Sequence, residues 1–462
     1  MVVGSNFMPT YAINQLEMFQ PDTFNITRID EELSWAENLG MNTMRVFLHD
    51  LLYQQDATGF KQRLDTFLGV CDKHEIKPLL VIFDSCWDPL PKIGKQHAPW
   101  PGVHNSGWVQ SPGAAALTDS SQYPRLEAYV KDLVGTFAND ARILGWDVWN
   151  EPDNGGGGDY NTNPSNKTAY VNLLLPQVFQ WARSVNPIQP LTSPLWTGFY
   201  NSPLYETEFI QLNYSDVISF HGYDDVDVFT KRIQFLQKYN RPIICTEYMA
   251  RGVGSRFENI LPVGRNYSIG MINWGFVQGK TQTFYPWDSW ANPYIEYQPW
   301  VWWHDVLRYD GTPYQLEEVN VIQKIKCKPG WYKSQVMNKC YKLFNMTMTW
   351  TDAEKMCRLN GGTVASISNT FENNDIQSYI SKSNSNCAGV LIGYVAKAEF
   401  GQGNSTDWYW YNGDKSGFTN WASGNPINDQ SSFCAALSQA NGQWTSKSCD
   451  IPVCHLCQIN LI

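Results

Sequence analysis

The sequence predicts an α/β protein of two domains: a parallel (β/α)8 barrel followed by a small disulfide-rich domain. Short apolar runs alternate with amphipathic stretches over roughly the first 300 residues, as in a barrel of strand and helix units. Cysteines are unevenly spread, since eight of the 11 lie after residue 326. An even number of cysteines in a short segment is typical of a disulfide framework formed in an oxidising compartment.

Eight predicted strands, most of them followed by an amphipathic stretch, make up the barrel. The expected strands are 2–7, 43–48, 78–83, 143–149, 191–196, 217–221, 242–247 and 269–276. The expected helices are 29–39, 60–74, 123–137, 169–185, 204–212, 228–239 and, after the eighth strand, 300–309. This order predicts a TIM barrel, in which functional side chains gather at the C-terminal ends of the strands. A doubly wound sheet is the alternative, but no glycine fingerprint follows the first strand.

The composition excludes several classes of partner. The formal net charge is -10, the pI is about 5.2 and no basic block is present, which argues against a nucleic-acid or anionic-membrane surface. No uninterrupted apolar segment is long enough to span a bilayer. Aromatic residues make up 14% of the chain, which suits stacking on sugars, although a large core also consumes them. We expect no nucleic-acid or membrane partner, no cofactor and no metal site.

Several features predict a secreted glycoprotein. The cysteine-rich segment requires an oxidising compartment. No signal peptide is visible at residues 1–4, so either the start is truncated or export takes another route, and the cysteines favour truncation. Six Asn-X-Ser/Thr triplets agree with secretion. They begin at Asn25, Asn166, Asn213, Asn266, Asn345 and Asn404.

Two of the predicted strands end in a glutamate. Glu151 follows the run 143–149 within the sequence Trp-Asn-Glu-Pro, and Glu247 closes the run 243–246. Two carboxyl groups about 5 to 5.5 Å apart, one as nucleophile and one as acid, perform glycoside hydrolysis with retention of configuration. Strands four and seven lie nearly opposite one another in a barrel, so acids at their ends can stand on the two sides of one glycosidic bond. The sequence therefore predicts a retaining glycosidase.

Residues at other strand ends complete the predicted site. Arg45 would hold a nucleophilic carboxylate ionised and oriented. Asn150 could hydrogen-bond the sugar 2-hydroxyl, and Trp274 would form the floor of the pocket. His221 and Tyr223 are two residues apart and hence on the same side. Tyr223 could donate to the glutamate of strand seven, and His221 could reach the glutamate of strand four or the substrate.

These residues carry a resemblance to a known family. With Asn150-Glu151-Pro152 and Thr246-Glu247, the first 320 or so residues resemble glycoside hydrolase family 5, the cellulase-like members of a clan of eight-fold barrels. The resemblance implies Glu151 as acid/base and Glu247 as nucleophile. It also implies supporting roles for Arg45, Asn150, His221, Tyr223 and Trp274.

The third strand departs from the pattern of that family. It ends Phe83-Asp84-Ser85-Cys86-Trp87, without the histidine that family 5 often carries there. His49 or His104 could fill that space, or Asp84 and Trp87 could contact the substrate instead. This departure leaves the subfamily open.

The cysteine-rich segment carries a second resemblance. Aromatic landmarks accompany the cysteines in Trp350 to Cys357, Trp408-Tyr409-Trp410 and Asn420-Trp421, so that residues 327–460 resemble a long-form C-type lectin domain of α+β type. The resemblance implies four disulfides, although the sequence alone leaves other pairings open. The implied pairs are Cys327 with Cys340, Cys357 with Cys457, Cys434 with Cys449, and Cys387 with Cys454. The remaining cysteines are expected to be buried apolar groups: Cys71, Cys86 and Cys245.

The predicted lectin-like domain lacks the usual calcium ligands. In sugar-binding members of the family, a Glu-Pro-Asn or Gln-Pro-Asp triplet and a Trp-Asn-Asp triplet supply oxygens to calcium. The matching positions read Asn425-Pro426-Ile427 and Trp444-Thr445-Ser446, with Asn428 and Asp429 nearby as alternatives. Calcium takes six to eight oxygens and favours carboxylates. We therefore expect no calcium-dependent sugar binding of the usual kind.

The sequence as a whole predicts a secreted, retaining β-glycosidase with an appended lectin-like module. Residues 1–322 would form the barrel and residues 327–460 the lectin-like domain. The expected partners are a poly- or oligosaccharide substrate and a glycan or protein ligand of the lectin-like domain. The alternative is a binding or defence protein whose barrel is inactive. A transglycosylase would carry the same residues, and the kind of sugar is not readable from them.

Overall fold

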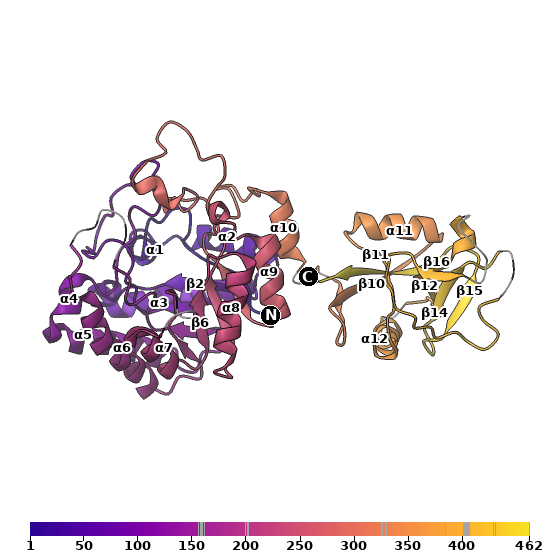
Figure 1. The fold of residues 1–462 in the computed structure, drawn as a ribbon, viewed down its shortest axis with the longest axis horizontal. Helices are drawn as coiled ribbons and strands as arrows, with labels where there is room; N and C mark the ends of the chain where they lie inside the picture. Colours follow the sequence, from indigo (N-terminus) through magenta and orange to yellow (C-terminus); the bar gives the residue numbers. More distant parts are fainter. Residues whose placement is uncertain are drawn as a thin grey trace. The chain divides into compact units, whose positions relative to one another are not determined.

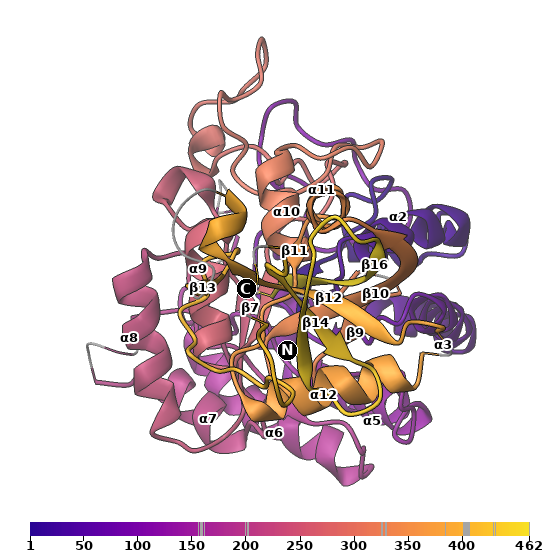
Figure 2. The same ribbon diagram turned by 90° about the vertical axis from the view of Figure 1, so that its right-hand side faces the viewer.

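The chain divides into two compact units, Met1–Ile322 and Gln323–Ile462 (Figures 1 and 2). The computed structural model describes residues 1–155, 157, 160, 162–198, 200, 203–324, 327–328, 330–383, 385–400, 407–427, 429 and 431–461. The glycosylation triplet predicted at Asn404 and the residue Asn428 lie outside the described residues. Within the described part of the chain, every helix is too short or too polar to cross a membrane.

The first unit contains an eight-stranded parallel sheet. Its strands are β1 (Val3–Asn6), β2 (Thr43–Phe47), β3 (Leu79–Val81), β4 (Gly145–Asp147), β5 (Leu191–Thr192), β6 (Ile218–His221), β7 (Ile243–Glu247) and β8 (Gly270–Asn273). The strand order is β5-β4-β3-β2-β1-β8-β7-β6, so that β1 pairs with both β2 and β8. A parallel bridge between Leu195 and Phe220 brings the chain after β5 to β6. The sheet is thus a nearly closed barrel, and the predicted TIM-barrel fold is confirmed.

Helices surround the strands of the barrel (Figure 1). They are α1 (Gln15–Phe19), α2 (Ile26–Asn38), α3 (Asp50–Lys73), α4 (Ala114–Thr118), α5 (Tyr123–Thr136), α6 (Lys167–Ser184), α7 (Glu206–Tyr214), α8 (Val226–Gln237), α9 (Phe257–Asn266) and α10 (Leu316–Gln323). Helix α5 shows why such segments fold against the sheet, because its buried side chains recur at the spacing of one helical face. These are Leu126, Tyr129, Val130, Leu133 and Val134.

One predicted helix is wrong. Residues 300–309 form no helix, and the first α-helix after β8 is α10. The backbone of Asp305 has a φ of 45°, a left-handed conformation that interrupts a right-handed helix. The apolar spacing reflects ring packing instead, since Trp302 stacks on Tyr314 with centroids 4.5 Å apart.

The second unit is a smaller α+β domain. Its sheet has the order β15-β14-β12-β16-β10-β9, with β11 paired to β16 and β13 to β12. The strands are β9 (Tyr332–Lys333), β10 (Lys339–Met348), β11 (Thr363–Val364), β12 (Gly389–Ala396), β13 (Trp408–Trp410), β14 (Cys434–Ser438), β15 (Trp444–Lys447) and β16 (Val453–Asn460). The helices are α11 (Trp350–Leu359) and α12 (Thr370–Ser381).

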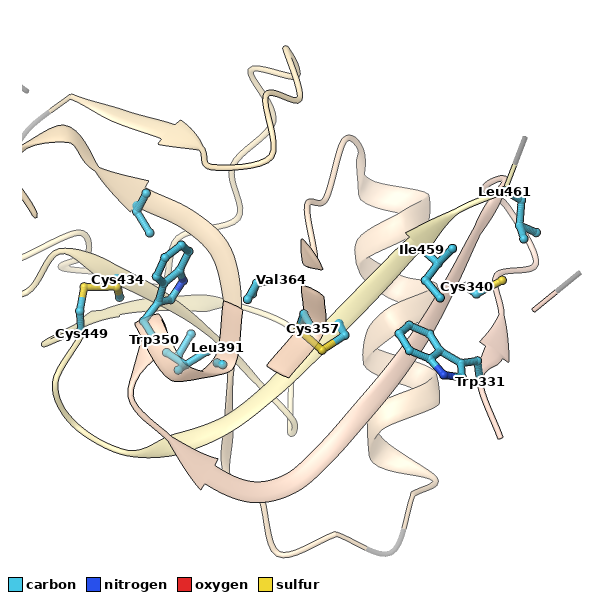
Figure 3. Close-up of a cluster of buried hydrophobic side chains, with 14 residues drawn as sticks. Trp331, Cys340, Trp350, Cys357, Val364, Leu391, Cys434, Cys449, Ile459 and Leu461 are labelled. Atoms are coloured by element: carbon cyan, nitrogen blue, oxygen red, sulfur yellow. A yellow bond between two sulfur atoms is a disulfide. The ribbon is translucent and has the colours of Figure 1, made fainter. Parts of the chain in front are cut away.

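Four disulfides fasten this domain, and one of them joins α11 to the sheet. They are Cys327–Cys340, Cys357–Cys457, Cys387–Cys454 and Cys434–Cys449, the pairs implied by the resemblance. Figure 3 shows Trp350 beside the Cys434–Cys449 disulfide in the buried apolar cluster of the unit. The link between Cys357 and Cys457 joins α11 to the last strand across 100 residues of sequence, so it removes much of the freedom of the unfolded chain.

Candidate active site

A cavity of about 430 Å³ opens at the C-terminal ends of the barrel strands. Strand ends supply the side chains expected there, because parallel strands direct their C-terminal residues to one face of the barrel. Seven of the predicted site residues line the cavity: Trp87, Asn150, Glu151, His221, Tyr223, Glu247 and Trp274. Arg45 is fully buried and touches the lining residues Asn150 and Glu247. The structure thus brings all but one of the predicted site residues together.

The two glutamates face one another across this cavity. A carboxylate oxygen of Glu151, a ring nitrogen of His221 and a carboxylate oxygen of Glu247 all lie within 4.8 Å of one another. Both acids are buried, with 9% of Glu151 and 6% of Glu247 exposed. This oxygen-to-oxygen approach is close to the ~5–5.5 Å between the two carboxyl groups of retaining glycosidases.

Glu247 is held by one cation and one hydroxyl. Arg45 Nη1 donates to Glu247 Oε1 over 2.9 Å, and the Tyr223 hydroxyl donates to Oε2 over 2.7 Å. Burial raises the pKa of Glu247 and also that of Glu151, because two buried carboxylates so close together are costly to ionise. Glu247 forms an ion pair with Arg45, and no such pair is seen for Glu151 among the described residues. The charge of the pair therefore belongs on Glu247 and the proton on Glu151.

The Arg45 guanidinium joins several strands beneath the cavity. Its Nε and Nη2 donate to Asp147 Oδ2 over 3.0 and 2.7 Å, and Nη1 donates to Asn6 Oδ1 over 3.0 Å. Nη2 also donates to Asn150 Oδ1 over 2.6 Å, which fixes the orientation of that amide. Burial alone would lower the pKa of Arg45, but the carboxylates of Asp147 and Glu247 outweigh it and raise the pKa. Arg45 therefore stays charged inside the barrel.

Glu151 is held by neutral groups. Asn154 Nδ2 donates to Glu151 Oε2 over 2.6 Å, and the Cys86 thiol donates to the same oxygen over 3.3 Å. Burial raises the pKa of Cys86 well above its usual value, so the sulfur keeps its proton. The backbone of Glu151 has a φ of 39°, an uncommon conformation for a long side chain. Burial favours the protonated form of Glu151, and the two neutral donors only partly oppose it because neither carries a positive charge.

His221 lies between the two acids. Its Nδ1 is 2.6 Å from Glu151 Oε1 and its Nε2 is 3.5 Å from Glu247 Oε1. Burial lowers the pKa of His221 to about 3, although the charge of Glu247 opposes the shift, so the ring is neutral. If Glu151 donates its proton to Nδ1, the N–H lies on Nε2 and faces the Glu247 carboxylate. Nε2 has no hydrogen-bond partner among the described residues, so its N–H is directed toward the charge of Glu247 without a hydrogen bond to it.

The segment between β3 and α4 supplies further side chains of the cavity. Asp84, Trp87 and His104 line the cavity, and Asp84 accepts hydrogen bonds from Asn150 Nδ2 (2.9 Å) and Trp108 Nε1 (2.5 Å). His49 has another role. It caps helix α3, where its Nδ1 accepts from the Leu51 N–H over 3.1 Å, and it is absent from the cavity lining within the described residues.

Some cavity residues were not predicted. Cys86 was expected to be a buried apolar group, but its thiol contacts Glu151. Asn154 lies three residues after that glutamate and could have been suspected from its position in the same loop. Asp224 and Arg232 form an ion pair on the cavity wall with 2.5 Å between Oδ2 and Nε. No sequence pattern connects these two residues, because the contact depends on how α8 packs.

The positions that match the calcium triplets are occupied by internal hydrogen bonds. Asn425 Oδ1 accepts from the Ser446 N–H over 2.9 Å, and the Ser446 hydroxyl accepts from the Ile427 N–H over 2.7 Å. Asp429 Oδ1 accepts from the N–H groups of Ser431 and Ser432 over 2.8 and 2.6 Å. Asn425, Ser446 and Asp429 thus each accept a hydrogen bond from the backbone of this domain.

Comparison with known proteins identifies the second unit. Residues 346–459 match the lectin C-type domain family. Mouse regenerating islet-derived protein 3-beta is 28% identical over 139 residues, which cover 29% of this chain and 78% of that protein. Human C-type mannose receptor 2 is 27% identical over 142 residues, which cover 30% of this chain and 9% of the receptor. The solved structure of human lithostathine is 23% identical with a TM-score of 0.27, and covers 29% of this chain and 99% of that chain. The second unit thus carries a C-type lectin-like domain.

Proposed function

We propose that the barrel is a retaining β-glycosidase, similar to glycoside hydrolase family 5, that hydrolyses O-glycosidic bonds of an oligo- or polysaccharide. The observation that carries this proposal is the pair Glu151 and Glu247, whose carboxylate oxygens approach within 4.8 Å in an open cavity. That separation suits a double displacement with one acid on each side of the bond. Buried carboxyl groups with raised pKa values also cluster at functional sites.

In the first step, Glu247 attacks the anomeric carbon while Glu151 gives its proton to the leaving oxygen. Arg45 and Tyr223 hold the Glu247 carboxylate in place for this attack. In the second step, the Glu151 carboxylate takes a proton from water, and the resulting nucleophile releases the sugar from Glu247. The neutral donors around Glu151 serve both of its forms, because none of them brings a charge that would prevent reprotonation.

We further propose that the protein is secreted and that the lectin-like domain binds a glycan without calcium. Four disulfides support an oxidising compartment. One relative of the chain is named a mannose receptor, which makes a glycan the favoured ligand. Asn425 and Ser446 are engaged with the backbone and bring no carboxylate, which is a poor ligand set for calcium. A glycan bound there would raise the local concentration of substrate at the barrel.

The nucleophile is tested by Glu247→Gln. The amide keeps the shape of the side chain but cannot form the covalent intermediate, so kcat should fall by several orders of magnitude while the circular dichroism spectrum is unchanged. In the unmodified protein, mass spectrometry after treatment with 2-deoxy-2-fluoro glycosides should find the label on Glu247. A label on Glu151 would reverse the two roles.

The acid is tested by Glu151→Ala. Only substrates with poor leaving groups need a proton, so the variant should lose far more activity on these than on activated aryl glycosides. Proton NMR of the products of the unmodified protein should show retained anomeric configuration. Equal losses on both kinds of substrate, or inversion, would contradict the two-step mechanism.

The Cys86 hydrogen bond predicts a pH effect. The thiol stabilises the ionised form of Glu151, so Cys86→Ala should raise the pKa of Glu151 further. Because the acid works only when protonated, the basic limb of the kcat/KM profile should move to higher pH. Cys71→Ala is the control, since Cys71 is also a free buried thiol but is absent from the described cavity lining. An unchanged limb, or one at lower pH, would refute the role of Cys86.

The absence of a usual calcium site is tested in the full chain. A bound ligand stabilises the folded state, so calcium would raise the unfolding temperature of a domain that binds it. We expect neither calcium nor chelator to change the unfolding temperature of the lectin-like domain. Asn425→Ala removes the acceptor for the Ser446 N–H and should lower that temperature equally with and without calcium. An increase on adding calcium would show that the domain holds the ion after all.

A further inference from the structure

Trp87 forms part of the cavity wall in a strained conformation. Its φ is 66°, which is rare for a bulky residue and is found where the surroundings enforce it. Gln110 Nε2 donates to the Trp87 carbonyl over 2.7 Å. Gly157 approaches the ring so closely that a Cβ there would lie 3.2 Å from it. The protein thus holds this indole in one orientation at the edge of the cavity.

Further aromatic rings continue from Trp87 toward the surface. Trp87 stacks on Trp290, with centroids 5.2 Å and planes 11° apart. Trp290 meets Trp100 at 5.4 Å and Tyr160 at 5.5 Å, both in perpendicular contact. Trp100 and Tyr160 lie 6.2 Å apart with planes at 28°. We call Trp100, Tyr160 and Trp290 the aromatic shelf.

The aromatic shelf is both accessible and fixed. Trp100 is 43% exposed, and Tyr160 and Trp290 are partly exposed. The backbone N–H of Trp100 donates to Ser106 Oγ over 2.9 Å, and the Tyr160 hydroxyl donates to the Ser106 carbonyl over 2.9 Å. A pre-ordered ligand surface loses little conformational freedom on binding, and exposed aromatic patches often mark ligand grooves.

A sugar chain fits this surface better than a lipid or an apolar peptide. A pyranose has a C–H face that packs on an aromatic ring and hydroxyl groups that stay in water. The shelf is also continuous with the cavity through the Trp87–Trp290 stack, and that cavity holds Glu151 and Glu247. A chain with one residue at the two acids can therefore place another residue on the shelf.

We propose that the aromatic shelf is a distal sugar-binding subsite, so that the substrate is an oligo- or polysaccharide that extends beyond the cavity. This inference rests on the proposed glycosidase function for its consequence in catalysis, but binding on the shelf can be measured without catalysis. The shelf makes the length of the glycan part of the specificity, in addition to the kind of sugar at the two acids.

The test is Trp100→Ala, with cellohexaose, mannohexaose and xylohexaose as long probes and the 4-nitrophenyl β-glycosides of the same sugars as short ones. The ratio of kcat/KM on the best hexasaccharide to kcat/KM on its aryl glycoside should fall about tenfold, because only the hexasaccharide reaches the shelf. Trp300→Ala is the matched control. Trp300 is 98% exposed and makes no ring contact within the described part of the chain, so the ratio should not change.

Calorimetry in the Glu247→Gln background separates the two proposals. If a hexasaccharide binds and Trp100→Ala weakens this binding about tenfold, the aromatic shelf is supported as a sugar-binding subsite. If at the same time the unmodified protein hydrolyses no probe, the glycosidase proposal fails and the shelf proposal does not. If the probes are hydrolysed but Trp100→Ala changes neither the ratio nor hexasaccharide binding, the shelf is refuted. Absence of hexasaccharide binding, or Trp100-dependent binding of phosphatidylcholine vesicles instead, refutes it as well.

Discussion

The inside of the barrel depends on one buried cation. Removing a guanidinium from water costs several kcal/mol, and the loss is offset at Arg45 by two carboxylates and two amide oxygens. These partners come from β1, β4 and β7 or the residues that follow them, so the ion network also fixes the relative positions of those strand ends. Glu247 belongs to this network. The geometry of the proposed nucleophile is therefore set by the same interaction that balances charge beneath the cavity.

Much of the site could be read from the sequence because its main residues end local apolar runs. Glu247 is the last residue of β7 and Glu151 lies shortly after the end of β4, and the barrel brings those strand ends together. The contacts around Glu151 could not be read in this way. Cys86 and Asn154 reach it from loops, whose paths follow from backbone conformations such as the positive φ of Glu151 rather than from any periodicity. The helix predicted at residues 300–309 was wrong for a similar reason, because the apolar residues there pack their rings together and do not form one face of a helix.

The two units reach stability by different means, and this decided how well each could be predicted. The barrel buries a large apolar core, so its strands and helices follow from hydrophobic periodicity. The lectin-like domain is small and relies on four disulfides. Eight cysteines allow 105 pairings, so only the resemblance to a family singled out the observed set. The two triplets that lack the usual calcium ligands were visible in the sequence, but the hydrogen bonds between Asn425, Ile427 and Ser446 were not.

The positive φ angles of Glu151 and Trp87 lower the stability of the barrel. Each such conformation stores strain, on the order of 1–3 kcal/mol, which a glycine would relieve. The buried carboxyl pair adds a further penalty that apolar residues would remove. A protein that used the barrel only as a support would gain stability from such replacements. The barrel therefore holds these cavity residues at a cost in stability, which its large apolar core offsets.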